Sequence, residues 1–237
     1  NSLTFLPLPA TIPAPKILTD LPPFTSTYTV KHSSRTHGDA FRYNNYDSPL
    51  AIAPLQGGTS YYIDDQMTMN AFLPSGALKF PQIIVHGVPN TNGGDIASVG
   101  FNKLLLAGDT PSGITGLKTQ AGFGGNDLWL LWRDIEGNYL MDKAFGGNGG
   151  ETAVKILKKT ENEIFVVATS TSGISGNKTS ASFGNSDIWV IKIDGNGNKL
   201  AEASFGGSST DAARDAILLN NGSIAIAGSS SSGPSGN

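Results

Sequence analysis

The most regularly placed carboxylates in the sequence stand just before two tryptophan-containing apolar segments. Asp127 and Asp187 occupy equivalent positions of two similar segments, and each stands two positions before a tryptophan, Trp129 or Trp189. A carboxylate in a cleft can serve as a catalytic acid, whereas a carboxylate at the start of a strand can cap backbone amides. Because a catalytic acid is needed only once, the recurrence favours capping, and the same reasoning applies to Asp211. We therefore predict no catalytic residue in this chain.

Two short polar stretches resemble metal-binding motifs. The stretch HSSRTHGD brings His32, His37 and Asp39 together, a set that suits zinc, but we interpret it as a polar loop. The stretch IDGNGNK resembles a calcium loop, yet it lacks the glutamate at the twelfth position and offers few oxygen ligands. We interpret residues 194–197 as a hairpin turn. With no cysteine in the chain, no nucleophile elbow and no phosphate-binding loop, we predict neither a metal nor a cofactor.

The candidates for ligand binding are aromatic and polar residues that depart from the regular pattern. The stretch FRYNNYD at 41–47 and a tyrosine pair at 61–62 combine flat apolar faces with hydrogen-bonding edges, which suits sugars or protein partners. The alternative is that these tyrosines form the core of a short sheet. A Trp-Arg pair replaces the Lys-Ile pair at the equivalent place of the next repeat, either facing a central channel or another chain, or adjusting a sheet edge. The binding candidates are Arg42, Tyr43, Tyr46, Tyr61, Tyr62, Trp132 and Arg133.

The strands and loops that position these residues are encoded by a repeated sequence segment. FGGNDLWLLWRDIEGN at residue 123 corresponds to FGNSDIWVIKIDGNGN at residue 183, and the segment from residue 144 corresponds to the segment from residue 204. The constant step between these pairs indicates repeated structural units. One unit predicts four strands, at 152–157, 163–169, 187–194 and 199–205, with a long Gly/Ser/Thr loop between the second and third.

The third strand of this unit is apolar on both faces. Ile188 and Val190 point to one side, and Trp189, Ile191 and Ile193 point to the other. A strand buried on both faces lies in a sheet between two other sheets, and small four-stranded sheets stacked around an axis form a β-propeller. We predict an all-β fold, a β-propeller of four-stranded blades with a repeat of about 60 residues, incomplete in this chain.

The predicted organisation follows from this repeat. Residues 1–38 form a Pro-rich extended segment with a candidate closing strand, FTSTYTVKH. Strands at 50–54, 59–63 and 66–72, and a fourth in KFPQIIVHG, form a shorter first unit. The predicted blades span 39–86, 87–145, 146–205 and, as a partial blade, 206–237, where the third strand is missing. This predicts strand completion by the rest of a longer chain or by another chain.

The composition argues against two classes of protein, nucleic-acid-binding proteins and proteins with a membrane-spanning helix. The net charge is -3 and only 15% of residues are charged, which argues against the clustered basic face of a nucleic-acid-binding protein. No apolar run approaches the roughly 20 residues of a membrane-spanning helix. The chain begins at Asn1 rather than Met, and we expect either a mature chain whose leader has been removed or a fragment.

The repeat resembles the secreted bacterial seven-bladed β-propeller (SBBP) repeat and similar repeats of exported Bacteroidota proteins. The resemblance is strong over residues 85–237, weak over 39–84 and absent over 1–38. It implies a propeller fold, a bacterial origin and export, by a type 9-like route, but no reaction. The matching residues are Asp187, Trp189, Lys192, Asp194, Gly197, Asn198, Gly206, Gly207, Asp211, Ala212, Gly222 and Gly228, and Gly146 and Gly147 occupy the equivalent Gly-Gly position one repeat earlier.

These observations lead to one expected function and two alternatives. We expect a non-enzymatic recognition or assembly module at the bacterial cell surface or in an extracellular structure, binding a protein partner or a cell-surface glycan through its loops. One alternative is a polysaccharide-acting hydrolase or lyase with its site in further blades, which would need a pair of carboxylates at glycosidase spacing. The other alternative is a passive structural spacer.

Overall fold

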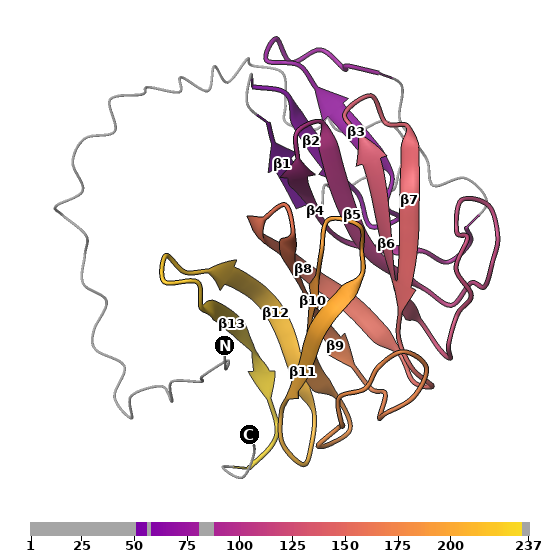
Figure 1. The fold of residues 1–237 in the computed structure, drawn as a ribbon, viewed down its shortest axis with the longest axis vertical. Helices are drawn as coiled ribbons and strands as arrows, with labels where there is room; N and C mark the ends of the chain where they lie inside the picture. The colour runs from indigo at the N-terminus through magenta and orange to yellow at the C-terminus, as the bar shows by residue number, and fades with distance from the viewer. Residues whose placement is uncertain (1–50, 56–57, 81–87, 234–237) are drawn as a thin grey trace, which may run out of the picture. The chain divides into compact units, whose positions relative to one another are not determined.

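The computed structural model describes residues 51–55, 58–80 and 88–233 (Figure 1). All described residues belong to one compact unit, Asp47–Asn237. Several predictions concern residues outside these ranges. They are the Pro-rich segment at 1–38 with its candidate closing strand FTSTYTVKH, most of the strand predicted in KFPQIIVHG, the three histidines His32, His37 and His86, and the binding candidates Arg42, Tyr43 and Tyr46.

The described residues form antiparallel β-sheets without helices, which confirms the all-β prediction. The first sheet has the order β1-β2-β3, with β1 at Ala51–Pro54, β2 at Ser60–Ile63 and β3 at Met69–Phe72. The second has the order β4-β5-β6-β7, with strands Asn92–Gly100, Lys103–Thr110, Asp127–Asp134 and Tyr139–Phe145. The third contains β8 to β11, with strands Glu151–Thr160, Glu163–Ser170, Asp187–Ile193 and Lys199–Phe205. The fourth pairs β12, Asp211–Leu218, with β13, Ile224–Ser230.

The strands predicted in the regular repeat lie where the sequence pattern places them, but one earlier strand is shorter than predicted. The strand predicted at 66–72 begins only at Met69. The preceding residues form a turn, because the Asp64 carboxylate accepts hydrogen bonds from the amides of Gln66 (2.9 Å) and Thr68 (2.8 Å). Met67 adopts a φ of 59° within this turn, a conformation incompatible with a strand.

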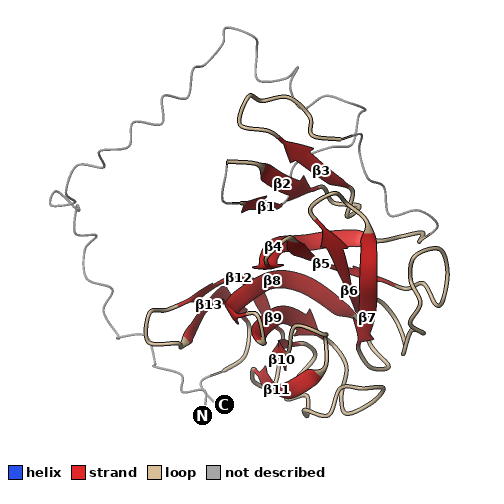
Figure 2. Ribbon diagram, turned by 45° about the horizontal axis from the view of Figure 1, so that its top comes forward, coloured by secondary structure: helices blue, strands red, loops and turns tan. Residues whose placement is uncertain are grey.

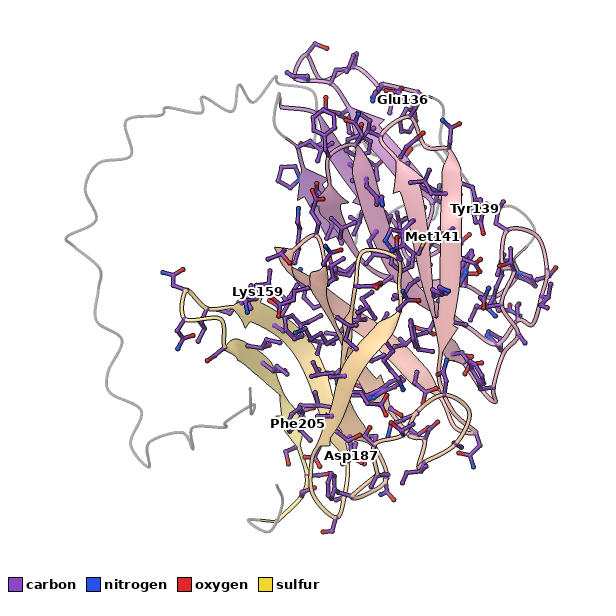
Figure 3. All side chains as sticks on the ribbon, viewed as in Figure 1. Glu136, Tyr139, Met141, Lys159, Asp187 and Phe205 are labelled. Carbon is purple, nitrogen blue, oxygen red and sulfur yellow. The ribbon has the colours of Figure 1, made fainter. Side chains whose placement is uncertain are left out.

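The sheets stack face to face in chain order, and Figure 2 shows this succession. One core lies between the first and second sheets, a second between the second and third, and a third between the third and fourth. Strand β10 contributes to two of them. Trp189, Ile191 and Ile193 pack against the second sheet, whereas Val190 and Ile188 pack toward the fourth. The predicted two-sided burial is thus confirmed, and the side chains that fill these layers are drawn in Figure 3.

Backbone hydrogen bonds also join one sheet to the next at equivalent places. The amide of Gly125 donates to the carbonyl of Gly149 (2.8 Å), and the amide of Glu151 donates to that of Asn126 (2.7 Å). One repeat later the amide of Asn185 donates to the carbonyl of Ser209 (2.8 Å), while that of Asp211 donates to Ser186 (2.9 Å). These bonds fix each first strand beside the third strand of the preceding sheet. Closure of the sheets into a ring is not seen among the described residues.

Truncation on either face of β10 is expected to destabilise the protein. Ile191→Ala should lower the free energy of unfolding by about 2–5 kcal/mol, and Val190→Ala by about 1–3 kcal/mol, because each substitution leaves a cavity in a different core. Urea unfolding followed by tryptophan fluorescence measures both. The control is Ile217→Ala on β12, whose side chain is 56% exposed and whose loss should change stability by less than about 0.5 kcal/mol. A Val190→Ala protein as stable as this control would contradict packing against the fourth sheet.

Candidate functional site

Two equivalent loops, residues 111–126 and 171–186, connect the second and third strands of the two complete sheets. Each loop folds back through a small antiparallel bridge, Thr115 to Lys118 in one and Ser175 to Lys178 in the other. The loops are therefore ordered parts of the fold, in contrast to flexible Gly/Ser linkers.

A buried lysine holds each loop from inside. Lys118 is 0% exposed and Lys178 is 1% exposed. The Lys118 ammonium donates to the carbonyl of Gln120 (2.5 Å), and the Lys178 ammonium donates to the carbonyl of Ser180 (2.7 Å) and the hydroxyl of Ser204 (3.0 Å). Burial lowers the pKa of both lysines, partly opposed by nearby carboxylates. Sequence reasoning missed this pair, although a lysine at the same place of the Gly/Ser/Thr loop in both repeats was an available signal.

Asp142 on β7 anchors the first loop from the sheet side. Its carboxylate accepts hydrogen bonds from the amide (2.9 Å) and hydroxyl (2.5 Å) of Thr119, the indole of Trp129 (2.9 Å) and the hydroxyl of Tyr139 (2.9 Å). Burial acts to raise the pKa of Asp142, but these hydrogen bonds hold it below its usual value.

Glu202 on β11 occupies the equivalent place in the next sheet. It accepts hydrogen bonds from the amide and hydroxyl (2.6 Å) of Thr179 and from the amide of Ser180 (2.5 Å). Lys199 donates to its other oxygen (2.7 Å). Burial acts to raise the pKa of Glu202 as well, and the contacts with Lys199 and Thr179 lower it overall.

The recurrent aspartates bind backbone amides at the ends of the same loops. Asp127 accepts the amide of Phe123 (2.7 Å), and Asp187 accepts that of Phe183 (2.8 Å). Asp211 accepts the amide of Gly207 (2.8 Å) in the same manner. These contacts are those of carboxylates that cap backbone amides. Burial raises the pKa of Asp127.

The second carboxylate oxygen of both Asp127 and Asp187 is buried and accepts no hydrogen bond from the described residues. Each of these oxygens lies against a glycine of the Gly-Gly pair that begins the next sheet. A methyl group added at Gly146 would stand 2.0 Å from Asp127 Oδ1, and one at Gly206 would stand 2.1 Å from Asp187 Oδ1. The recurrence of glycine here follows from this close approach.

The anchored loops expose the same apolar residues in each repeat. Ile114 is 71% exposed and Ile174 is 69% exposed, and Phe123 and Phe183 are also exposed. Neighbouring loops touch, because a Cβ built on Gly176 would lie 2.9 Å from Phe123 Cβ. We call Ile114, Phe123, Ile174 and Phe183 the loop surface. An apolar surface held by buried polar anchors is suited to contact with another macromolecule.

The binding candidates on β2 and β6 have different positions from this surface. Tyr61 is fully buried, and its hydroxyl donates to the carbonyl of Ile135 (2.8 Å). Tyr62 is half-buried and stacks on Phe72, with ring centroids 5.6 Å apart. For Tyr61 this is the core role considered as the alternative.

The Trp-Arg pair at 132–133 is buried as well. Trp132 is fully enclosed in the core between the second and third sheets. Arg133 donates to the carbonyl of Gly137 (2.7 Å) in the hairpin turn after β6, and burial lowers its pKa. Burial keeps both side chains from any external partner in this structure, so the departure from the repeat serves packing and the turn.

No metal centre is found in the part of the chain that the structure describes: no three histidine, aspartate or glutamate side chains there gather as ligands. The calcium-like stretch forms a turn between β10 and β11. The Asp194 carboxylate accepts the amides of Asn196 (2.9 Å) and Asn198 (2.8 Å), and Gly197 adopts a φ of 73°. Both amides bind one oxygen of Asp194, and the other oxygen accepts the side-chain amide of Asn198 (2.9 Å), an arrangement expected of a hairpin turn.

Comparison with other proteins adds no assignment. No protein-family model matches the chain, and no curated protein matches it. None of the described residues belongs to a helix with the length and apolar character required to cross a membrane.

Removal of the Asp142 carboxylate is expected to destabilise the protein in a pH-dependent manner. Asp142→Ala should cost about 2–4 kcal/mol at pH 7, because the indole of Trp129 and the amide of Thr119 lose their acceptor. The folded-state pKa of Asp142 lies below the usual 3.8, so its contribution is complete above that value and disappears as the pH falls through the folded pKa. Urea unfolding at pH 7 and at stepwise lower pH measures the difference between variant and wild type.

The control for this experiment is Asp65→Ala, which removes an exposed carboxylate. This control should change stability by less than about 0.5 kcal/mol at every pH. A difference between Asp142→Ala and wild type that stays constant down to low pH would contradict the anchoring role of an ionised carboxylate.

Alanine at the second Gly-Gly pair is expected to be poorly tolerated. Gly206→Ala places a methyl group against the buried carboxylate of Asp187 and should cost about 1–3 kcal/mol in unfolding free energy. Gly173→Ala is the matched control, because a methyl there meets nothing within 4 Å. Thermal unfolding of both variants measures the difference in stability. Equal stability of Gly206→Ala and Gly173→Ala would show that Asp187 can move away from the added methyl group.

Proposed function

We propose that the chain is a non-enzymatic recognition or assembly module of the β-propeller type, acting at the bacterial surface or in an extracellular structure. The observation that carries the proposal is the loop surface, in which two equivalent loops present the same exposed apolar residues from a rigid support. Rigid scaffolds that display loops are suited to binding, because little conformational entropy is lost on association.

The propeller architecture is supported by three features of the described sheets. The two complete sheets have the same meander order, they pack through both faces, and their first strands follow one another, with β4 next to β8 and β8 next to β12. Repeated small sheets with adjacent first strands suit radial stacking around an axis. Export and a bacterial source rest on the resemblance to the SBBP repeat.

A binding role, as opposed to catalysis, is supported by the state of the recurrent carboxylates. Asp127, Asp187 and Asp211 each accept a backbone amide, and Asp142 is occupied by four donor groups. Carboxylates engaged in this way position the loops. We infer a protein partner for the loop surface because its most exposed residues, Ile114 and Ile174, are aliphatic, whereas its two phenylalanines are less exposed.

The loop surface can be tested with intact cells of the producing organism as the probe. Fluorescently labelled protein should bind these cells, and Ile114→Ser combined with Ile174→Ser should weaken binding by about tenfold through lost apolar contact. Prior protease treatment of the cells should abolish binding, whereas periodate oxidation of surface sugars should leave it unchanged. The matched control is Ile217→Ser with Leu219→Ser, two exposed apolar residues of the fourth sheet region.

Two results would contradict the proposal. One is an absence of saturable binding to the cells at any concentration. The other is equal loss of binding in the loop variant and the control variant. Sensitivity to periodate with resistance to protease would reassign the partner to a glycan.

A further inference from the structure

A β-bulge recurs at the same place in three first strands. The pairing register shifts between Gly93 and Asp95 in β4, between Ala153 and Lys155 in β8, and between Ala213 and Asp215 in β12. The extra residues are Gly94, Val154 and Arg214, which occupy equivalent positions of successive repeats. A bulge re-aims the side chains around it and is common beside functional sites.

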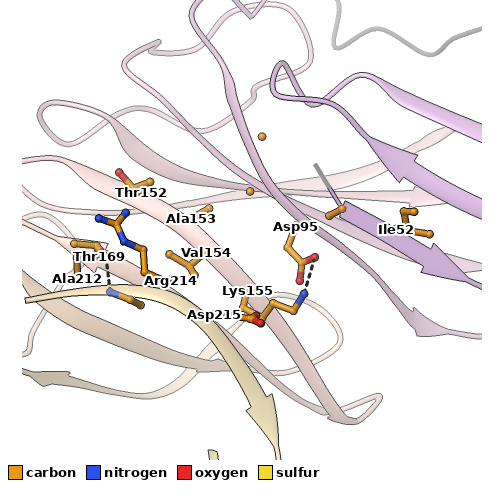
Figure 4. Close-up of a pocket in the computed structure, with 14 residues that line it drawn as sticks. Ile52, Asp95, Thr152, Ala153, Val154, Lys155, Thr169, Ala212, Arg214 and Asp215 are labelled. Carbon is orange, nitrogen blue, oxygen red and sulfur yellow. Dashed lines mark hydrogen bonds and ion pairs between the residues drawn. The ribbon is translucent and has the colours of Figure 1, made fainter. Parts of the chain in front are cut away.

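The three bulges line one pocket of about 700 Å³, drawn in Figure 4. Its wall also includes Ile52 from β1, Thr152 from β8 and Thr169 from β9. The volume lies within the range of about 300–1,000 Å³ typical of small-molecule sites. None of the pocket residues belongs to the loops at 111–126 or 171–186, so the pocket is separate from the loop surface.

The residues that line the pocket differ from one repeat to the next, whereas several of the residues that hold the loops and strands are the same in both copies. The buried lysine, the capping aspartate, the tryptophan and the Gly-Gly pair are the same in both copies of the repeat. Position 95 and its two counterparts are instead Asp, Lys and Asp, and Arg214 stands where β8 has Val154. A shared backbone bulge with different charges indicates that each sheet contributes its own chemistry to one asymmetric site.

Two charged groups of the pocket have no ion-pair partner among the described residues, the Arg214 guanidinium and the Asp215 carboxylate, and both residues are exposed. Asp95 is 3% exposed, accepts the amide of Ile156 (2.8 Å) and lies 3.4 Å from the Lys155 ammonium. Arg214 makes no hydrogen bond or ion pair with any residue that the structure describes. In Figure 4 its side chain extends toward Thr152, while Lys155 extends toward Asp95.

The polar groups of the pocket wall match a ligand that carries both a carboxylate and hydroxyl groups. A guanidinium group presents paired donors that match a carboxylate, and the Lys155 ammonium has further donors beyond its contact with Asp95. Thr152 and the Asp215 carboxylate, one oxygen of which accepts the amide of Ala216 (2.8 Å), offer hydrogen-bonding groups for hydroxyls. We propose that the pocket binds an acidic sugar of the uronic acid class, with Arg214 holding its carboxylate and with the Lys155 ammonium, Thr152 and the Asp215 carboxylate available to its hydroxyl groups.

Isothermal titration of the whole chain with galacturonate and digalacturonate tests this proposal, with galactose and inorganic phosphate as comparison probes. Galacturonate and its dimer should bind saturably, and galactose and phosphate should bind at least about tenfold more weakly, since each lacks half of the recognised chemistry. Arg214→Gln should weaken uronate binding by about tenfold or more, and Arg214→Lys should give an intermediate loss because it keeps the charge without the paired donors.

The matched control is Lys158→Gln, which removes an exposed lysine of β8 that does not line the pocket and should leave uronate binding unchanged. Thermal unfolding of each variant confirms that the fold is retained. Equal affinity for galactose and galacturonate, equal affinity for phosphate and galacturonate, or unchanged binding by Arg214→Gln would each overturn the proposal. So would the absence of saturable uronate binding.

The pocket and the loop surface are separable by the same experiments. The Ile114→Ser/Ile174→Ser variant should bind galacturonate as the wild type does. A failure of cell binding therefore leaves the pocket proposal standing, and a failure of uronate binding leaves the loop proposal standing.

Discussion

The structure depends on the burial of both faces of the third strands, β6 and β10. Each carries a tryptophan and alternating aliphatic residues, so neither face can be exposed to water without a large hydrophobic cost. A single sheet with one face exposed to solvent cannot bury the apolar side chains on both faces of such a strand. The sheets must therefore stack, and each sheet supplies the cover that its neighbour requires. The backbone bonds between 124–126 and 149–151, and between 184–186 and 209–211, then set the order in which neighbours meet.

The long loops remain ordered because polar groups inside the fold hold them from two sides. Each loop inserts a lysine of its own, Lys118 or Lys178, into the fold, where its ammonium donates to a carbonyl of the same loop. Asp142 and Glu202, on the last strand of each sheet, accept hydrogen bonds from loop amides and hydroxyls. Buried charged groups are costly unless their hydrogen bonds are satisfied. A loop that moved away would separate Thr119 from Asp142, or Thr179 from Glu202, and would leave the carboxylate without these donors. This cost keeps each loop in place.

Equivalent residues in the two copies of the repeat make different contacts. In the second sheet Asp142 binds the indole of Trp129, whereas in the third the indole of Trp189 finds no acceptor among the described residues and the Lys178 ammonium lies 5.7 Å from the ring centroid. Glu202 reaches the loop and Lys199 instead. The anchoring thus tolerates a change of partner, while the first-strand bulges keep one backbone form and change their charges. The differences at the bulges change the charges that line the pocket.

The sequence by itself determined the all-β class, the strand positions of the regular repeat and the two-sided burial of β10. These follow from local spacing, because alternation along a strand and glycine-containing turns are properties of neighbouring residues. The turn at 194–197 was predicted for the same reason. The burial of Tyr61, Trp132 and Arg133, the closing of loops over Lys118 and Lys178, and the pocket around Arg214 were decided only by the tertiary structure. They depend on contacts between residues far apart in sequence and on bulges that shift which face a side chain occupies, and no local pattern contains that information.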